Sequence, residues 1–310
     1  MIKKILINLA LVFVAVFLID FTLGKVPRYY YFKETAGQHF CTTYSMEKTR
    51  ADVLVFGSSR ANHHYVPGVF EDSLKMSFYN TGRDGTGIFY HLAILKAILK
   101  RYTPKMIVLD YTGGFEKETA SYDRLSVLLP YYKTHPEIRS IIRLKGPFER
   151  FKLLSEIYPF NSQILTIAKG NSNSGRNHDF DLKGYIPLFN EWTGKIEKDK
   201  IQPDLPLDSN KVNALHEFIR MAKKAGINIF VVSSPVFMIC NGRQEFDVCK
   251  KICSIEGVPY WNYYKDTLFL KNGRLFQDVG HLNQKGAVIF SKLIVQKIGE
   301  ELKKENNSKK

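Results

Sequence analysis

The chain has 310 residues and a formal net charge of +15, with 45% hydrophobic and 24% charged residues. This composition excludes a mainly disordered chain, a collagen-like repeat and a membrane protein with many spans, and the length suits one large α/β domain with a membrane-proximal segment. The positive charge favours an anionic partner such as lipid headgroups, an envelope polymer or nucleic acid.

An apolar run from Ile5 to Ile19 follows Lys3 and Lys4 at the N-terminus. About 20 apolar residues are needed to cross a bilayer, and flanking lysines favour the cytoplasmic side. We expect an uncleaved signal anchor over residues 1–24, with a cleaved signal peptide at Thr22–Gly24 as the alternative. Both alternatives place the main domain outside the cytoplasmic membrane, so we expect a single-pass protein of that membrane and no nucleic-acid partner.

Residues 25–50 are expected to be a membrane-proximal linker, because the aromatic cluster Tyr29–Phe32 is typical of a membrane interface. The main α/β domain is expected over residues 51–302. A polar tail should follow over residues 303–310.

Short apolar runs that end in polar or glycine-bearing turns predict five strands, at residues 53–56, 77–82, 105–111, 227–235 and 259–264. Helical periodicity predicts helices between and after them, at residues 88–102, 212–225, 246–256 and 285–302. Strands that alternate with helices predict an α/β fold, a three-layer α/β/α sandwich with a mainly parallel five-stranded sheet. Residues 116–208 break the alternation and are expected to form a helical insertion, with a polar loop at 170–179.

The four cysteines are Cys41, Cys240, Cys249 and Cys253. In an oxidising compartment they allow one or two disulfides, and their spacing assigns none. Because no histidine accompanies them at a ligand spacing, we expect no metal site, and no cofactor motif is present.

Two segments carry residues suited to nucleophilic chemistry. Gly57-Ser58-Ser59 directly follows the first strand, where a serine side chain is exposed at a strand-to-helix turn. Asp278 stands three residues before His281, ahead of the last helix, and an aspartate so placed can orient an imidazole toward a serine. The carboxyl ends of parallel strands meet at one edge of a sheet, so we expect the two segments to converge.

These segments resemble the SGNH, or GDSL-like, hydrolase superfamily from about residue 52 to the C-terminus, outside the insertion. The first block of that family matches Gly57–Ser59, with serine in place of aspartate, and the last block matches Asp278–His281. Asn80–Gly82 lies where the family has its second-block glycine. The third-block asparagine is missing, because the third strand ends Leu109–Gly114.

The Gly-Ser-Ser form on a single N-terminal anchor looks more like the branch with the D-alanyl transfer protein of lipoteichoic acid and the alginate O-acetylation proteins. That resemblance implies acyl transfer through a serine ester, with a membrane-bound O-acyltransferase as a partner. Ser59 would be the nucleophile, favoured over Ser58 by the Gly-x-Ser spacing. His281 would be the base and Asp278 would orient it.

The same resemblance implies an oxyanion site formed by the amides of Ser59 and Gly82. Thr112 or Gly113 would supply a third donor, and the missing asparagine could cost on the order of 3 kcal/mol of transition-state stabilisation. Arg60 and Thr112 are candidate substrate-binding residues. The pair His63 and His64 either helps to recognise an anionic polymer or belongs to a solvated basic first turn.

Three functions remain open from the sequence. The leading one is extracytoplasmic O-acyl transfer, with acetyl as the expected group, to an envelope polysaccharide or a related polymer. The others are an SGNH esterase or deacetylase, and a membrane-tethered protein without catalysis that binds or assembles a polymer.

Overall fold

The computed structural model describes residues 1–111, 113–172, 183–198, 206–239 and 244–308. The chain forms two compact units. The first unit comprises Met1–Thr43 and Thr119–His178, and the second unit comprises Tyr44–Glu118 and Asp179–Lys310. The insertion expected over residues 116–208 is therefore shared between the units.

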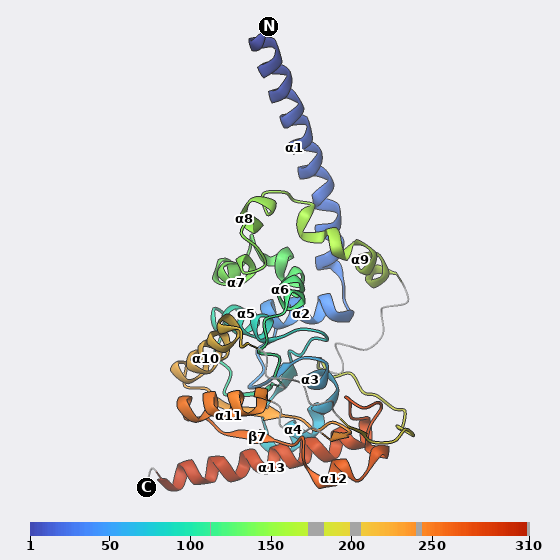
Figure 1. Ribbon diagram of the computed structural model, residues 1–310, viewed down its shortest axis with the longest axis vertical. Helices are drawn as coiled ribbons and strands as arrows, with labels where there is room; N and C mark the ends of the chain where they lie inside the picture. Colours follow the sequence, from blue (N-terminus) through green and yellow to red (C-terminus); the bar gives the residue numbers. More distant parts are fainter. Residues whose placement is uncertain (112, 173–182, 199–205, 240–243, 309–310) are drawn as a thin grey trace. The chain divides into compact units, whose positions relative to one another are not determined.

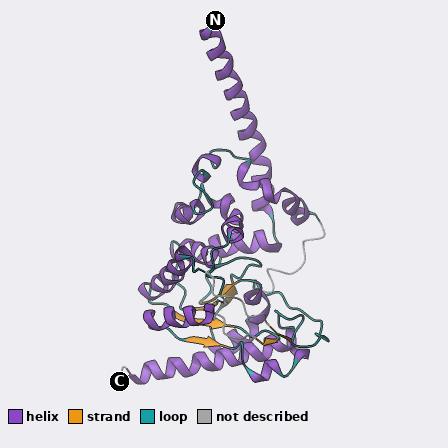
Figure 2. Ribbon diagram, viewed as in Figure 1, coloured by secondary structure: helices purple, strands orange, loops and turns teal. Residues whose placement is uncertain are grey.

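A five-stranded parallel sheet forms the centre of the second unit (Figures 1 and 2). Its strand order is β2-β1-β3-β5-β7. The strands are β1 (Val53–Gly57), β2 (Phe78–Asn80), β3 (Met106–Asp110), β5 (Asn228–Ser233) and β7 (Tyr260–Asn262). Neighbouring strands pair in parallel throughout. The predicted α/β architecture and all five predicted strands are confirmed.

Helices cover both faces of this sheet. One face carries α3 (Ser59–His64), α4 (Pro67–Leu74) and α13 (Gln284–Ser308), and the other carries α5 (Ile88–Leu99), α10 (Ser209–Lys224) and α11 (Gln244–Glu256). Alternate side chains of β1 serve the two layers: Val53 and Val55 belong to the cluster of Phe290 on α13, whereas the ring of Phe56 meets that of Phe218 on α10 at 5.2 Å.

Several short elements of the second unit, α4 among them, were not predicted from the sequence. Strand β4 (Glu197–Lys198) pairs in parallel with β6 (Met238–Ile239), and a short helix α12 (Thr267–Leu270) follows β7. Two-residue strands carry no readable periodicity. Helix α13 is longer than expected from the sequence. It extends to Ser308 and so includes most of the polar tail expected over residues 303–310.

The first unit is helical. Its longest element is α1 (Ile2–Lys33), and it also contains α6 (Thr119–Asp123), α7 (Arg139–Arg143), α8 (Glu149–Lys152) and α9 (Ile164–Asn171). Turns of 3-10 helix lie at Arg124–Tyr131, Pro136–Ile138 and Tyr158–Gln163. The buried ring of Tyr31 anchors this unit, because it meets Tyr131 at 5.9 Å and Phe160 at 5.7 Å.

The segment expected to be a linker over residues 25–50 is instead mostly helical. Helix α1 continues without a break to Lys33, with Pro27 inside it, and α2 (Gly37–Glu47) follows. Helix α1 is compatible with a signal anchor or one membrane span, by its length and composition.

Candidate active site

The first turn of α3 presents Ser59 at the end of the central strand β1. Gly57, the last residue of that strand, has a φ of +152°, and a Cβ at this position would lie 2.7 Å from the carbonyl oxygen of Asp110 and 2.7 Å from Ala61 Cβ. A side chain is therefore excluded where β1 meets β3 and turns into α3. This close approach fixes where the Ser59 hydroxyl emerges.

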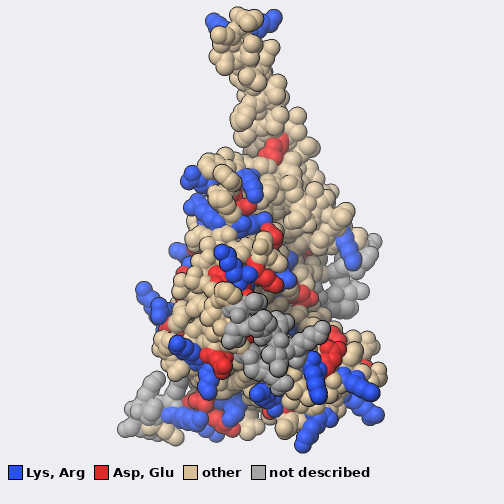
Figure 3. Space-filling view, in the orientation of Figure 1, with Lys and Arg blue, Asp and Glu red and all other residues tan. Residues whose placement is uncertain are grey.

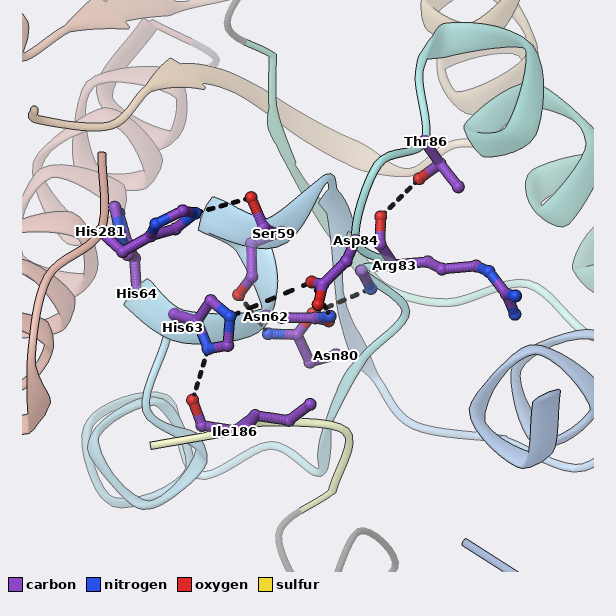
Figure 4. Close-up of polar contacts among 12 residues, drawn as sticks. Ser59, Asn62, His63, His64, Asn80, Arg83, Asp84, Thr86, Ile186 and His281 are labelled. Carbon is purple, nitrogen blue, oxygen red and sulfur yellow. Dashed lines mark hydrogen bonds and ion pairs between the residues drawn. The ribbon is translucent and has the colours of Figure 1, made fainter. Parts of the chain in front are cut away.

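The structure brings Ser59, His281 and Asp278 together. Figure 4 shows Ser59 next to His281, from which it is separated by 222 positions in the sequence. The Ser59 Oγ lies 2.7 Å from His281 Nε2. On the other side of the ring, His281 Nδ1 lies 2.9 Å from Asp278 Oδ1 and 3.1 Å from Oδ2. Since a carboxylate accepts, Nδ1 carries the proton and Nε2 accepts the serine hydroxyl, which is the pairing that a general base requires.

The loop that carries His281 is held by its own backbone. Asp278 Oδ1 accepts the N–H groups of Gly280 at 2.7 Å and His281 at 3.0 Å. The Gln277 N–H donates to the His281 carbonyl oxygen at 2.8 Å. These bonds set the carboxylate and the imidazole in one orientation before any substrate arrives. Asp278 nevertheless remains open to solvent, with 48% of its side chain exposed against 28% for His281.

Two further histidines surround the site, and both are buried rather than part of a solvated basic turn. The His63 ring meets that of His281 edge to face at 5.4 Å, and its Nδ1 lies 2.7 Å from the carbonyl oxygen of Ile186 (Figure 4). Burial lowers the pKa of His63 despite the opposing effect of the Ile186 carbonyl and Asp84. Burial also lowers the pKa of His64 well below its usual value, so both rings are neutral at neutral pH.

Gly82 is buried against α3. A Cβ there would lie 2.8 Å from Asn62 Oδ1 and 2.9 Å from Ala61 Cβ. Its N–H, however, donates to Asn80 Oδ1 at 2.9 Å. The amide expected to bind an oxyanion is thus engaged by a side chain of its own turn. The Ser59 N–H lies in the first turn of α3, where a helix leaves its N–H groups without intrahelical acceptors.

The other candidate site residues lie in different surroundings. The Arg60 Nη1 donates to the hydroxyl of Tyr264, and its guanidinium carbon lies 5.2 Å from the centre of that ring. Gly113 has a φ of +101° and packs so closely on Glu245 that a Cβ would lie 2.3 Å from Glu245 Cγ. Thr112 lies outside the described residues.

Asp110, which the sequence placed at the end of the third strand as either a second acid or a cap of the turn, is buried behind the nucleophile turn. Asp110 pairs in register with Gly57, and its Oδ1 accepts the Ser234 N–H at 3.4 Å. Burial raises the pKa of Asp110, and the charge of Arg60 opposes that rise. The side chains of Ser234 and Tyr65 interact with this carboxylate and also lower its pKa. Asp110 is thus a buried acid beside the β1 terminus.

Two of the cysteines lie together on one helix of the second unit. Cys249 and Cys253 are buried in α11 without a disulfide between them. Cys240 lies outside the described residues. Over the described ranges, no group of three or more His, Cys, Asp or Glu side chains is placed to hold a metal ion.

Comparisons with known proteins give distant structural similarity only. No family model matches the chain, and no curated protein matches it. A solved structure from Bacteroides fragilis, named as an acylhydrolase, is 13% identical with a TM-score of 0.42, over 87% of this chain and 99% of that one. A GDSL-like lipase from Bacteroides thetaiotaomicron is 13% identical with a TM-score of 0.37, over 80% of this chain and 88% of that one.

Proposed function

We propose that the chain is a serine-dependent acyl-transfer enzyme of the SGNH type. The observation that carries this proposal is the contact of 2.7 Å between Ser59 Oγ and His281 Nε2, with Asp278 on the other ring nitrogen. A nucleophile, a base and an orienting acid in this order match the chemistry of ester formation on serine. The Gly-Ser-Ser and Asp-x-x-His blocks supply the resemblance to that superfamily.

The reaction would proceed in two balanced steps. Ser59 Oγ attacks the carbonyl carbon of an ester or thioester, His281 Nε2 takes the hydroxyl proton, and Asp278 stabilises the imidazolium. The departing alcohol or thiol receives that proton, which leaves an acyl ester on Ser59. An acceptor hydroxyl then gives its proton to His281 and its oxygen takes the acyl group, and His281 returns the proton to Ser59 Oγ, which regenerates the serine and the neutral imidazole.

More specifically, we place the enzyme outside the cytoplasmic membrane, tethered by α1, and acting on an envelope polysaccharide or a related polymer. The net charge of +15 and the apolar helix support this assignment. The acyl group would be acetyl, and a membrane-bound O-acyltransferase would be the partner that carries it across the bilayer, because a single helix offers no path for that transfer.

Phosphonate labelling tests the nucleophile. The full chain in detergent micelles is incubated with a fluorophosphonate and analysed by intact mass and peptide mapping. We expect one adduct on Ser59, its loss in Ser59→Ala and its retention in the neighbouring variant Ser58→Ala. An adduct on Ser58 would reassign the nucleophile, and a folded chain without any adduct would contradict the proposal.

Acceptor dependence tests the transferase assignment. The chain is given an aryl acetate with and without a soluble anionic polysaccharide, and acetyl groups on the polymer are counted by mass spectrometry. Acetylated polymer that disappears in Ser59→Ala supports transfer, whereas release of acetate alone supports the SGNH esterase or deacetylase.

One observation favours the non-catalytic alternative. Because the Gly82 N–H is already bound to Asn80 Oδ1, the site has fewer free donors for an oxyanion than the family pattern implies. If Ser59→Ala, Asp278→Asn and His281→Ala all kept full cellular function, polymer binding without catalysis would replace the enzyme.

A further inference from the structure

The N-terminal, apolar stretch of α1 in the first unit has side chains that the described protein does not cover. The stretch of α1 that is apolar enough to span a membrane has none of its residues buried. Figure 3 shows this part of the helix as a surface without Lys, Arg, Asp or Glu between the lysines at its tip and a single acidic group near its base. An α-helix rises 1.5 Å per residue, so about 20 residues cross the hydrocarbon core. Counted from Ile5, the twentieth residue is Gly24.

The helical insertion is fastened to α1 at that depth. The Asp20 carboxylate accepts the Ser155 hydroxyl at 2.6 Å and the Glu156 N–H at 2.7 Å. One turn further on, Gly24 is buried so closely on Glu156 that a Cβ would lie 2.3 Å from Glu156 Cβ. These contacts set residues 155–157 at the end of the apolar stretch of α1, which is where the hydrocarbon core of a bilayer would end.

Several large apolar side chains next to this fastening point are exposed. The exposed fractions are 65% for Phe148, 52% for Phe151, 71% for Leu154, 50% for Ile164 and 86% for Leu165. Exposed basic residues stand among them, and the Arg150 guanidinium lies 4.4 Å from the centre of the Phe151 ring. In Figure 3, blue groups gather over α7 and α8. Apolar and basic side chains so mixed are typical of a surface that lies in lipid headgroups.

A cleft of about 580 Å³ opens between α1 and α9 beside these side chains. Its size is within the range of ordinary ligand pockets, ~300–1,000 Å³. Its lining is mainly apolar, with Asn171 and Ser172 as polar residues at one end. The lining residues are Leu23, Val26, Pro27, Tyr30, Ile157, Ile164, Ile167, Ala168, Asn171 and Ser172. The cleft thus begins on α1 at the residue before Gly24, level with the expected edge of the hydrocarbon.

A different face of the same stretch of α1 is cationic. Lys25, Arg28 and Lys33 line a second hollow with the rings of Tyr29 and Phe32. Basic and aromatic side chains in this combination suit the headgroup layer of an anionic membrane. About three turns of α1 therefore offer apolar contacts on one face and positive charge on another, as a phospholipid requires of a site at the interface.

We propose that the first unit is a lipid-interface module, in which the cleft between α1 and α9 holds one acyl chain of a bilayer phospholipid. Phe148, Phe151, Leu154 and Leu165 lie in the headgroup layer around it. This inference rests on the proposed insertion of α1 in a membrane, but it is independent of any chemistry at Ser59.

Tryptophan quenching tests the depth of the module. Phe151→Trp and Leu165→Trp are prepared in the full chain and reconstituted into nanodiscs of phosphatidylethanolamine and phosphatidylglycerol with nitroxide-labelled phosphatidylcholine. The matched control is Ile255→Trp, which replaces a side chain of the second unit that is 61% exposed. We expect about twofold stronger quenching at positions 151 and 165 than at 255, above the background of Trp192 and Trp261.

Carbonate extraction of the same membranes tests the membrane insertion of α1 separately from the contact of the first unit with the lipid headgroups. Chain that is released by carbonate would contradict the membrane insertion of α1. Chain that is retained but shows equal quenching at all three positions would overturn the lipid-interface module while leaving the anchor intact. Neither outcome bears on labelling at Ser59.

Photocrosslinking tests the cleft itself. A phospholipid with a diazirine on its acyl chain is incorporated in the nanodiscs, and adducts are mapped by mass spectrometry. We expect adducts in residues 23–30 and 164–172, reduced about tenfold by Ala168→Trp, which fills the cleft. The control Thr166→Trp lies on the same helix outside the lining and should retain them. Adducts elsewhere only, or equal yields in both variants, would overturn the acyl-chain site.

Discussion

The Nε2 atom of His64 accepts the backbone N–H of Leu282 at 2.9 Å, and this bond ties the helix of Ser59 to the loop of His281. His64 is fully buried, and desolvation lowers its pKa well below the ordinary value, with smaller contributions from the charges of Arg60, His281 and His63. A protonated ring could not accept this bond. The neutral state of His64 is therefore part of the geometry of the site.

His64→Leu should leave the buried Leu282 N–H without an acceptor, at a cost of about 1–3 kcal/mol. We treat His64 as a positioning residue. The substitution should therefore lower the rate of Ser59 labelling at saturating phosphonate about tenfold, and should change the phosphonate concentration that gives half of that rate much less. His64→Gln, whose amide oxygen can accept the same N–H, should recover much of the rate. Equal rates in the Leu and Gln variants would show that the bond does not position the loop.

Gly57→Ala should destabilise the second unit by about 2–4 kcal/mol, because the added Cβ meets the Asp110 carbonyl at 2.7 Å and the positive φ disfavours a side chain. The measurement is urea unfolding in detergent micelles. Gly68→Ala is the matched control, since Gly68 lies inside α4 and a Cβ added there would meet nothing within 4 Å. An equal loss in both variants would refute the role assigned to the β1 terminus.

The order of the blocks along the chain was enough to predict that Ser59, Asp278 and His281 converge. Parallel strands bring their carboxyl ends to one edge, and strands β1, β3 and β5 are apolar enough to be recognised. The part played by His64 could not be predicted, because its ring contacts a backbone N–H 218 residues away and no spacing in the sequence encodes such a bond. The same holds for the bond between the Gly82 N–H and Asn80.

Acid should destabilise the second unit through its buried histidines. Burial lowers the pKa of His91 in α5 to about 3, against an ordinary 6.5. Below about pH 6.5 the unfolded chain takes up a proton that folded His91 does not, so stability is full above that pH and falls as the pH drops toward 3. One histidine with a pKa lowered in this way reduces the free energy of unfolding by about 2 kcal/mol when the pH falls from about 7 to 5.

The free energy of unfolding in urea, measured at about pH 7 and about pH 5, should therefore differ less between the two pH values in His91→Leu than in the unsubstituted chain. Part of the dependence should remain, because the pKa values of His63 and His64 are lowered as well. An unchanged difference in the His91 variant would mean that this ring can be protonated in the folded state.

Gly24→Leu should separate α1 from the segment that Asp20 holds, because no side chain fits between Gly24 and Glu156. Hydrogen exchange in nanodiscs should then be faster, about tenfold, at the Glu156 amide that donates to Asp20. Gly146→Ala is the control in the same unit, with its nearest neighbour at 3.8 Å. Unchanged exchange in Gly24→Leu would show that Asp20 alone holds the segment.

The first unit shows where sequence patterns carry too little information. The apolar run of α1 was evident, but its helical continuation to Lys33 depends on contacts such as that of Tyr31 with Tyr131, which lies 100 residues further on. The α-helices in the described part of the insertion have four to eight residues, too few for an amphipathic period to be distinguished from chance.

The exposure of Asp278 has a consequence for how long an acylated serine would survive. A half-exposed carboxylate and a partly exposed imidazole leave bulk water free to reach the base that activates it. The lifetime of the acyl-serine would then depend on the molecule that covers this edge of the sheet. An acceptor that shields His281 when it binds would slow hydrolysis of the acyl-serine by water. Shielding of the His281 imidazole would thus determine how long the acyl-serine persists before water hydrolyses it.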